Sequence, residues 1–123
     1  MGMTTIELLQ AAVRAAESRK ATDSVILDLR GISTVTDFFI VCSGTSDTNV
    51  RAIADAVEET LKKEGHPPHG VEGREEKTWI LLDYVDFVVH VFQHEKRLAF
   101  SLENLWEDAK RIPVESAEAA AGT

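Results

Sequence analysis

Residues 38–46, Phe-Phe-Ile-Val-Cys-Ser-Gly-Thr-Ser, decide the fold, because they predict a buried strand that turns directly into a helix. The run 38–42 is apolar at every position, which is typical of a strand covered on both faces. Residues 43–46 break the strand, and Ser46 is a suitable N-cap for a helix that ends at Gly65. We therefore expect a strand–turn–helix unit at the centre of the fold.

Further elements are predicted on both sides of this unit. An amphipathic helix is expected over residues 4–20, where Thr4 and Glu7 have capping-box spacing, and a strand over 25–29. After the Pro-Pro loop 66–70, a short edge strand is expected near Val71. The β-rich runs 78–82 and 87–92 predict an antiparallel hairpin, followed by a helix from about 95 to 110 whose apolar side carries Leu98, Leu102, Leu105, Trp106 and Ala109.

This order of elements predicts the α/β class, with a mixed β-sheet sandwiched by helices. The length of 123 residues suits one domain, which we place at 1–112. The Ala- and Glu-rich segment 113–123 has little to bury, so we expect it to be a disordered tail.

The hairpin divides its side chains between two sheet faces. We expect Leu82 to face Phe87 and Trp79 to face His90 across the two strands. One face is uniformly apolar and suits packing under helices: Ile80, Leu82, Phe87, Val89 and Val91. The other carries Trp79, Leu81, Val88, His90 and Phe92, with acidic residues at its rim, and is either a docking surface for a basic protein or the seat of the first or last helix.

Composition narrows the class of partner. The net charge is −8, which argues against a protein that grips nucleic acid phosphates through a basic face, and no sequence-specific nucleic acid is expected. The lone Cys42 excludes an intramolecular disulfide and favours a reducing compartment. No apolar run approaches the roughly 18 residues of a membrane span, so we expect no membrane association and a cytoplasmic protein.

No catalytic set, metal site or cofactor site is predicted. The turn 43–48 could hold an anion at a helix start, which keeps a nucleotide-binding, transferase-like enzyme as an alternative, but it lacks the Walker spacing and capping explains it more simply. Cys42 ends an apolar run, where a thiol is usually inert. The histidines lack metal-ligand spacing: His66, His69, His90 and His94.

Several strings, taken together and in order, carry a resemblance to a known family. They are Asp28-Leu29-Arg30-Gly31, Thr36-Asp37-Phe38-Phe39, Ser43-Gly44-Thr45-Ser46, Val71-Glu72-Gly73, Trp79-Ile80-Leu81-Leu82-Asp83-Tyr84, Val88-Val89-His90-Val91-Phe92 and Leu102-Glu103-Asn104-Leu105-Trp106. Between about residues 7 and 106 the chain resembles the ribosomal silencing factor (Iojap) family.

The resemblance implies a nucleotidyltransferase-like fold without catalytic residues. It also implies a translation repressor that binds the large ribosomal subunit through large-subunit protein fourteen, blocks association with the small subunit and can form a homodimer. The partner-binding residues that it implies are Trp79, Leu81, Asp83, Tyr84, His90, Phe92, Arg97 and Glu103. Val85 and Phe100 depart from the family pattern, which often has Gly and Tyr there, so the turn is expected to differ locally.

Overall fold

The computed structural model describes residues 2–115, and its secondary structure follows the predicted order with additions at the C-terminal end. The capping box at the start of the first helix is present, since Thr4 and Glu7 each accept a hydrogen bond from the backbone N–H of the other. In chain order the elements are α1 (Thr5–Ser18), β1 (Thr22–Asp28), β2 (Phe38–Gly44), α2 (Asp47–Lys63), β3 (Gly70–Glu72), β4 (Trp79–Asp83), β5 (Phe87–Gln93), α3 (His94–Phe100), α4 (Leu102–Leu105) and β6 (Lys110–Ile112).

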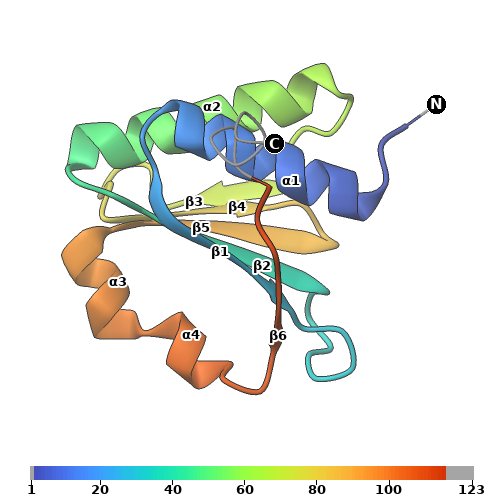
Figure 1. Ribbon diagram of the computed structural model, residues 1–123. Helices are drawn as coiled ribbons and strands as arrows, with labels where there is room; N and C mark the ends of the chain where they lie inside the picture. Colours follow the sequence, from blue (N-terminus) through green and yellow to red (C-terminus); the bar gives the residue numbers. More distant parts are fainter. Residues whose placement is uncertain (1, 116–123) are drawn as a thin grey trace.

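The six strands form one mixed sheet in the order β3-β4-β5-β2-β1-β6 (Figure 1). The central pair β2–β5 is parallel, and the neighbouring pairs are antiparallel. A parallel pair requires a crossover, which here runs from β2 through α2 to the hairpin. The predicted mixed sheet with helices is therefore confirmed.

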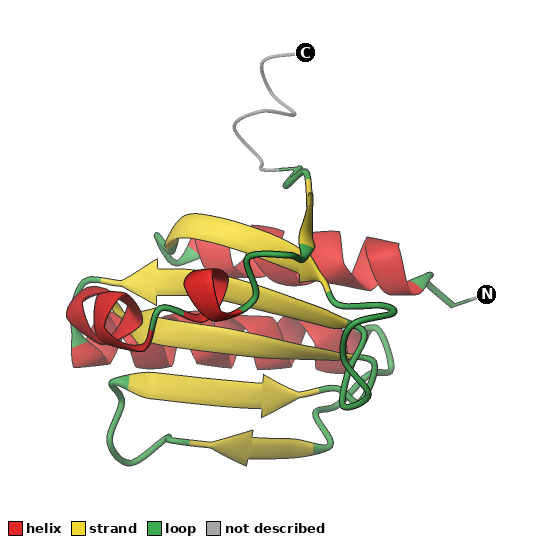
Figure 2. Cartoon of the chain, turned by 90° about the horizontal axis from the view of Figure 1, so that it is seen from below, coloured by secondary structure: helices red, strands yellow, loops and turns green. Residues whose placement is uncertain are grey.

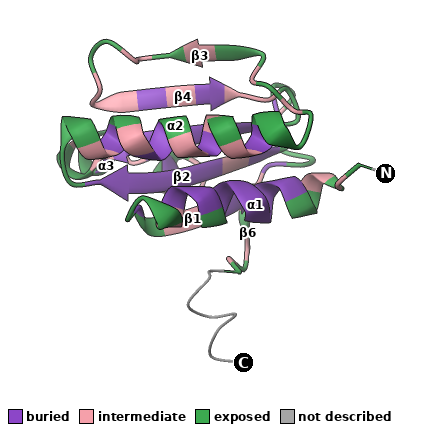
Figure 3. Ribbon diagram, turned by 90° about the horizontal axis from the view of Figure 1, so that it is seen from above, coloured by how far each residue is buried: buried purple, intermediate pink, exposed green. Residues whose placement is uncertain are grey.

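Helices lie on both faces of the sheet, but they cover the two faces unequally. The long helices α1 and α2 lie over one face, and the short helices α3 and α4 lie under the other (Figure 1). Figure 3, viewed from the α1–α2 side, shows β2 buried beneath these helices. Figure 2 shows the opposite side, where α3 and α4 leave β3 and β4 without a helix in front of them.

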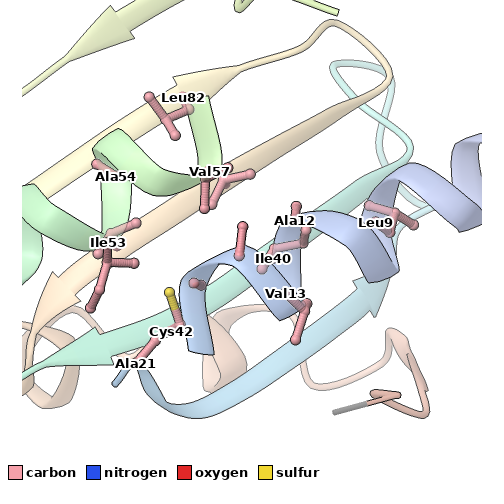
Figure 4. Close-up of a cluster of buried hydrophobic side chains, with 14 of the residues drawn as sticks. Leu9, Ala12, Val13, Ala21, Ile40, Cys42, Ile53, Ala54, Val57 and Leu82 are labelled. Carbon is pink, nitrogen blue, oxygen red and sulfur yellow. The ribbon is translucent and has the colours of Figure 1, made fainter. Parts of the chain in front are cut away.

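The main core lies between the sheet and the layer formed by α1 and α2 (Figure 4). Leu9 and Val13 of α1, and Ile53 of α2, are fully buried and meet Ile40 of β2 in one cluster. Burial of each such side chain stabilises the fold by about 1.5–3 kcal/mol. Cys42 lies in the same core, and burial raises the pKa of its thiol to about 12, so it behaves as a small apolar residue.

The hairpin register differs from the predicted one by two residues. Trp79 pairs with Phe92, and Leu81 pairs with His90, instead of Trp79 pairing with His90. The shift arises because Asp83 remains in β4 opposite Val88, which moves the turn toward the C-terminal side. A shift of two residues preserves the alternation, so the division of side chains between the two faces is confirmed.

The predicted last helix is wrong beyond residue 100. Ser101 adopts a left-handed backbone conformation (φ 51°, ψ 52°), which ends α3 and starts the separate turn α4. Residues 110–112 then form β6, which pairs antiparallel with β1. Leu98 and Leu105, predicted to lie on a buried side, are 67% and 72% exposed.

A glutamine in α1 holds the segment that follows β6. The Nε2 of Gln10 donates to the carbonyl of Pro113 at 2.9 Å, and its Oε1 accepts from the N–H of Glu115 at 2.9 Å. Contact with the domain therefore extends past the predicted boundary at residue 112, because the buried carboxamide of Gln10 satisfies backbone groups on both sides of Val114. The rest of the expected tail, 116–123, lies outside the described residues.

We expect Gln10→Ala to lower the free energy of unfolding by about 1–2 kcal/mol, because two hydrogen bonds are lost at a buried position. The amide of Glu115 should also exchange faster with solvent deuterium. Gln10→Glu, which keeps the acceptor but loses the donor, should fall between the two proteins. An unchanged rate of deuterium exchange at the Glu115 amide in Gln10→Ala would contradict the hydrogen bonds from Gln10 to this segment.

Candidate docking face

Side chains from three strands gather on the sheet face opposite α1 and α2. Phe39 of β2, Trp79 and Leu81 of β4, and His90 and Phe92 of β5 share this face by strand register, and we call these five residues the docking face. Phe92 is fully buried and His90 is 4% exposed. The remaining three side chains are partly exposed, so the face combines a buried floor with an accessible aromatic and aliphatic surface.

Ring contacts hold the aromatic side chains of this face in place. The indole of Trp79 stacks on Phe92 with ring centroids 4.8 Å apart and lies 4.6 Å from the ring of Phe100 in α3. Phe39 meets His90 edge-on at 4.4 Å and Trp106 at 6.2 Å. Such pairs contribute about 0.5–1.5 kcal/mol beyond area burial, which makes Trp79 a rigid anchor.

His90 fixes the orientation of Trp79. The indole Nε1 donates to the Nδ1 of His90 at 3.1 Å, so the imidazole must be neutral at that nitrogen and carry its proton on Nε2. Burial lowers the pKa of His90 to about 4, because a charged imidazolium would lose its hydration. The Nε2 is buried and has no hydrogen-bond partner within the described residues, so nothing there compensates a charge.

The short C-terminal helices cover only half of this face. Leu102 packs on Val41 and Phe92, so the β2–β5 part lies under α3 and α4. Figure 2 shows no helix in front of β4, and Trp79 and Leu81 on that strand are partly exposed. The prediction that the last helical segment packs on this face therefore holds for the half over β2 and β5, and the docking of a partner on the other half stays a prediction.

Arg97 and Glu103 lie at the edge of the covered half and form an internal ion pair. The Nε and Nη2 of Arg97 donate to the two carboxylate oxygens of Glu103 at 3.3 and 3.1 Å, and Nη1 donates to the hydroxyl of Ser43 at 2.9 Å. Arg97 is only 6% exposed. The pair therefore joins α3 to α4 across the break at Ser101, and the predicted contact of these two residues with a partner stays a prediction.

Asp83, the last residue of β4, shares the sheet face of Trp79 and Leu81 by strand alternation, whereas Tyr84 in the following turn does not. The carboxylate of Asp83 accepts from the N–H of Val85 at 2.8 Å. Tyr84 stacks on Phe87 at 4.9 Å and packs against the main core, and burial raises the pKa of its hydroxyl. Tyr84 is thus not brought together with Trp79, although its neighbour Asp83 lies on the strand that carries it.

The structure adds residues that the sequence-based site omitted. Phe39 was predicted only as part of a buried strand, and alternation along that strand would have placed it on the docking face. Phe100 and Trp106 join the face because the chain breaks at Ser101, for which the residue type gives no signal. Glu72 and Glu76 line a groove beside Trp79, where the edge strand and its loop meet β4.

The turn after β2 is occupied by its own capping interactions. Asn49 accepts from the N–H of Thr45 through Oδ1 at 2.9 Å, and the N–H of Asn49 donates to the Ser46 hydroxyl at 3.1 Å. The amides of Thr45 and Asn49 are therefore engaged within the turn itself. Within residues 2–115, no group of three or more His, Cys, Asp or Glu side chains is placed to hold a metal ion. Over the same range, no helix is both long and apolar enough to cross a membrane.

Comparison with known proteins decides the family. The sequence model of the family described as "Ribosomal silencing factor during starvation" matches residues 3–123 of the chain. The chain belongs to this family. The ribosomal silencing factor of Halalkalibacterium halodurans is 41% identical over 113 residues, which cover 92% of this chain and 97% of that protein.

Two further comparisons agree with this assignment. A crystal structure of a protein from Chromobacterium violaceum superposes with a TM-score of 0.83 at 32% identity, covering 95% of this chain and 98% of that one. A protein of Mus musculus named "Mitochondrial assembly of ribosomal large subunit protein 1" is 27% identical over 104 residues, which cover 82% of this chain and 44% of that protein. The family is named for a regulator of the ribosome, and the expectation that the chain is not an enzyme is confirmed by that membership.

The turn between β4 and β5 contains a strained residue. Val85 has φ 71°, a region that a β-branched side chain rarely adopts, and the N–H of Asp86 donates to the carbonyl of Tyr84 across it at 2.8 Å. The side chain of Val85 is 59% exposed and gains little packing in return. This conformation favours glycine, which lacks a Cβ.

We expect Val85→Gly to raise the free energy of unfolding by about 1 kcal/mol, because it removes the Cβ that the positive φ disfavours. Val35→Gly is the matched control, since Val35 is 86% exposed in a loop and its φ is not positive. That control should lower stability slightly through added freedom of the unfolded chain. Equal losses in both variants, measured by urea unfolding, would show that the turn is not strained.

The free energy of unfolding of this protein should depend on pH through His90. Because the folded protein lowers the pKa of His90 from 6.5 to about 4, the neutral form is favoured on folding. The resulting stabilisation is fully present above pH 6.5 and is lost as the pH falls toward 4, by about 3 kcal/mol in total.

Urea unfolding of the wild type and of His90→Gln between pH 7 and 4 tests this dependence. Glutamine keeps a carbonyl acceptor for the Trp79 indole but does not titrate, so its stability should fall less steeply over this range. Carboxylates titrate in both proteins, so their contribution to the pH dependence cancels when the two profiles are compared. Parallel pH profiles would contradict a buried neutral histidine.

Proposed function

We propose that this protein represses translation by binding the large ribosomal subunit through large-subunit protein fourteen and by sterically blocking the small subunit. The observation that carries the proposal is the accessible half of the docking face, where Trp79 and Leu81 of β4 stay partly exposed and the Trp79 ring is held by Phe92 and Phe100. A steric block needs a firmly held surface and no chemical step, which agrees with a family of ribosome regulators.

The energetics of such a surface depend on few residues. Aromatic anchors near the centre of an interface commonly contribute 2 kcal/mol or more each, as a rough guide, when they are held in a fixed geometry before binding. Trp79 meets that condition through its stacking on Phe92 and its hydrogen bond to His90. Leu81 lies two residues further along the same strand and extends the apolar surface toward Asp83.

Charge supports a basic protein as the partner. The chain carries a net charge of −8, and acidic side chains at 72, 76 and 83 lie close to the two anchors. Opposite charge on the partner accelerates association and selects orientation, whereas ribosomal RNA phosphates would be repelled. The chain should therefore dock on a protein of the subunit surface.

The proposal also includes the target subunit, the compartment and the self-association of the protein. The name of the Mus musculus relative refers to mitochondrial assembly of the ribosomal large subunit, which supports the large subunit as the target. We place the activity in the cytoplasm, and the free protein can use the docking face for a homodimer contact. The mixed sheet suits a nucleotidyltransferase-like fold, and the capped turn after β2 favours no nucleotide.

The double variant Trp79→Ala/Leu81→Ala should lose co-sedimentation with purified large subunits. Loss of both anchors is expected to weaken binding by more than about 100-fold, because two interface anchors are truncated together. The circular-dichroism spectrum should remain that of the wild type, since the main core lies on the other side of the sheet.

Ile6→Ala is the matched control, because Ile6 is an exposed apolar residue of α1 on the opposite side of the sheet. It should co-sediment as the wild type does, and the wild type in excess should keep mixed subunits from forming intact ribosomes. Retained binding by a folded double variant would reject this site.

A further inference from the structure

A groove of about 270 Å³ lies beside the indole of Trp79, at the edge of the sheet. Its lining combines an aromatic ring, an aliphatic side chain and two carboxylates, contributed by Glu72, Gly73, Glu76, Trp79 and Leu81. Among these lining residues there is no basic side chain. The groove is thus a small acidic and apolar depression next to the strongest anchor of the docking face.

The backbone explains why these side chains share one groove. Glu72 of β3 pairs with Leu81 of β4, so the two side chains lie on the same sheet face as Trp79. The loop that follows closes on itself through the N–H of Lys77, which donates to the carbonyl of Gly73 at 2.9 Å. Gly73 has φ 88°, and a Cβ there would collide with the carbonyl of Trp79, so the loop approaches the strand too closely for any side chain.

The nearest arginine does not neutralise the groove. Arg74 bonds to Asp55 at 2.6 Å and also pairs with Glu58, and both carboxylates belong to α2. Its guanidinium is therefore held at the helical layer, where two acidic groups already engage it. Glu72 and Glu76 form no ion pair within the described residues that would compensate their charge.

The aromatic cluster already attracts a cation at its other side. The Nζ of Lys96 lies 5.1 Å from the centroid of Phe100, whose ring lies 4.6 Å from that of Trp79. A cation over an aromatic face is stabilised by the ring quadrupole, and nearby carboxylates add to that attraction. The groove offers both features together on the β3 side of Trp79.

We propose that this groove receives one lysine or arginine side chain of the basic protein partner. The aliphatic stem packs between Trp79 and Leu81, and the charged head pairs with Glu72 and Glu76. An apolar side chain would leave two carboxylates at the rim desolvated without a partner, and a phosphate would be repelled, so charge complementarity selects a cation. The identity of the partner rests on the proposed function, whereas the chemistry of the groove does not.

Fluorescence of Trp79 tests the groove without the ribosome. In Trp106→Phe the protein retains one tryptophan, so titration with hexalysine or hexaarginine should change the emission of Trp79, while an uncharged Gly-Ser hexapeptide should not. Glu72→Gln/Glu76→Gln in this background should weaken the response at least tenfold.

The matched control is Glu59→Gln/Glu64→Gln, which removes the same charge from α2 and its C-terminal end, on the opposite side of the sheet. It should weaken the response less than twofold. Equal weakening in both double variants, or no change in Trp79 emission with either basic peptide, would overturn the groove.

Co-sedimentation with large ribosomal subunits distinguishes the proposed groove from the proposed function. Glu72→Gln/Glu76→Gln should weaken co-sedimentation at least fivefold and flatten its dependence on salt, because one buried cation contact is lost. Unchanged affinity and salt dependence in that variant would overturn the groove and leave the proposed function standing. If the wild type binds the basic peptides but does not co-sediment with large subunits, the proposed function is overturned and the groove stands.

Discussion

The parallel pairing of β2 with β5 is the constraint on which the rest of the structure depends. These strands lie at the centre of the sheet and are buried over most of their length, so most of their side chains are apolar, and the buried polar side chains Ser43 and His90 are hydrogen-bonded. Parallel pairing requires α2 to cross over one face of the sheet. Helix α1 packs beside α2 in the same layer and shares its core. The opposite face is then left to whatever follows β5, which is a short and broken helical segment.

Unequal coverage of the two faces is what creates the candidate site. The aromatic side chains of β4 and β5 alternate with core residues, so a fold that buries Ile80 and Leu82 must present Trp79 and Leu81 on the other side. Leu102 closes the half that lies over β2 and β5. Trp79 remains at the boundary between the covered and uncovered halves, with its polar N–H satisfied by His90 and its ring partly exposed.

Local patterns in the sequence predicted the elements and faces, but not the features set by long-range contacts. The capping box at Thr4, the central strand and the alternation along the hairpin are short-range signals, and each is confirmed. The hairpin register depended on one carboxylate, because Asp83 stays in the strand and accepts from Val85. The break at Ser101 and the strand β6 depend on pairing with β1 across the whole domain, which no window of residues reports. The groove at Glu72 could not be predicted, since it requires the edge strand and its loop to be placed in space.

The bonds from Arg97 to Glu103 and Ser43 hold a helical segment that is attached to the sheet less firmly than the α1–α2 layer. The α1–α2 layer shares a large apolar core with the sheet, whereas α3 and α4 are held by few buried side chains and this charged link. Segments with few apolar contacts open locally at a lower free energy than the whole domain. The C-terminal helical segment should therefore detach as a separate folding unit, transiently uncovering Val41 and Phe92 while the rest of the sheet stays intact.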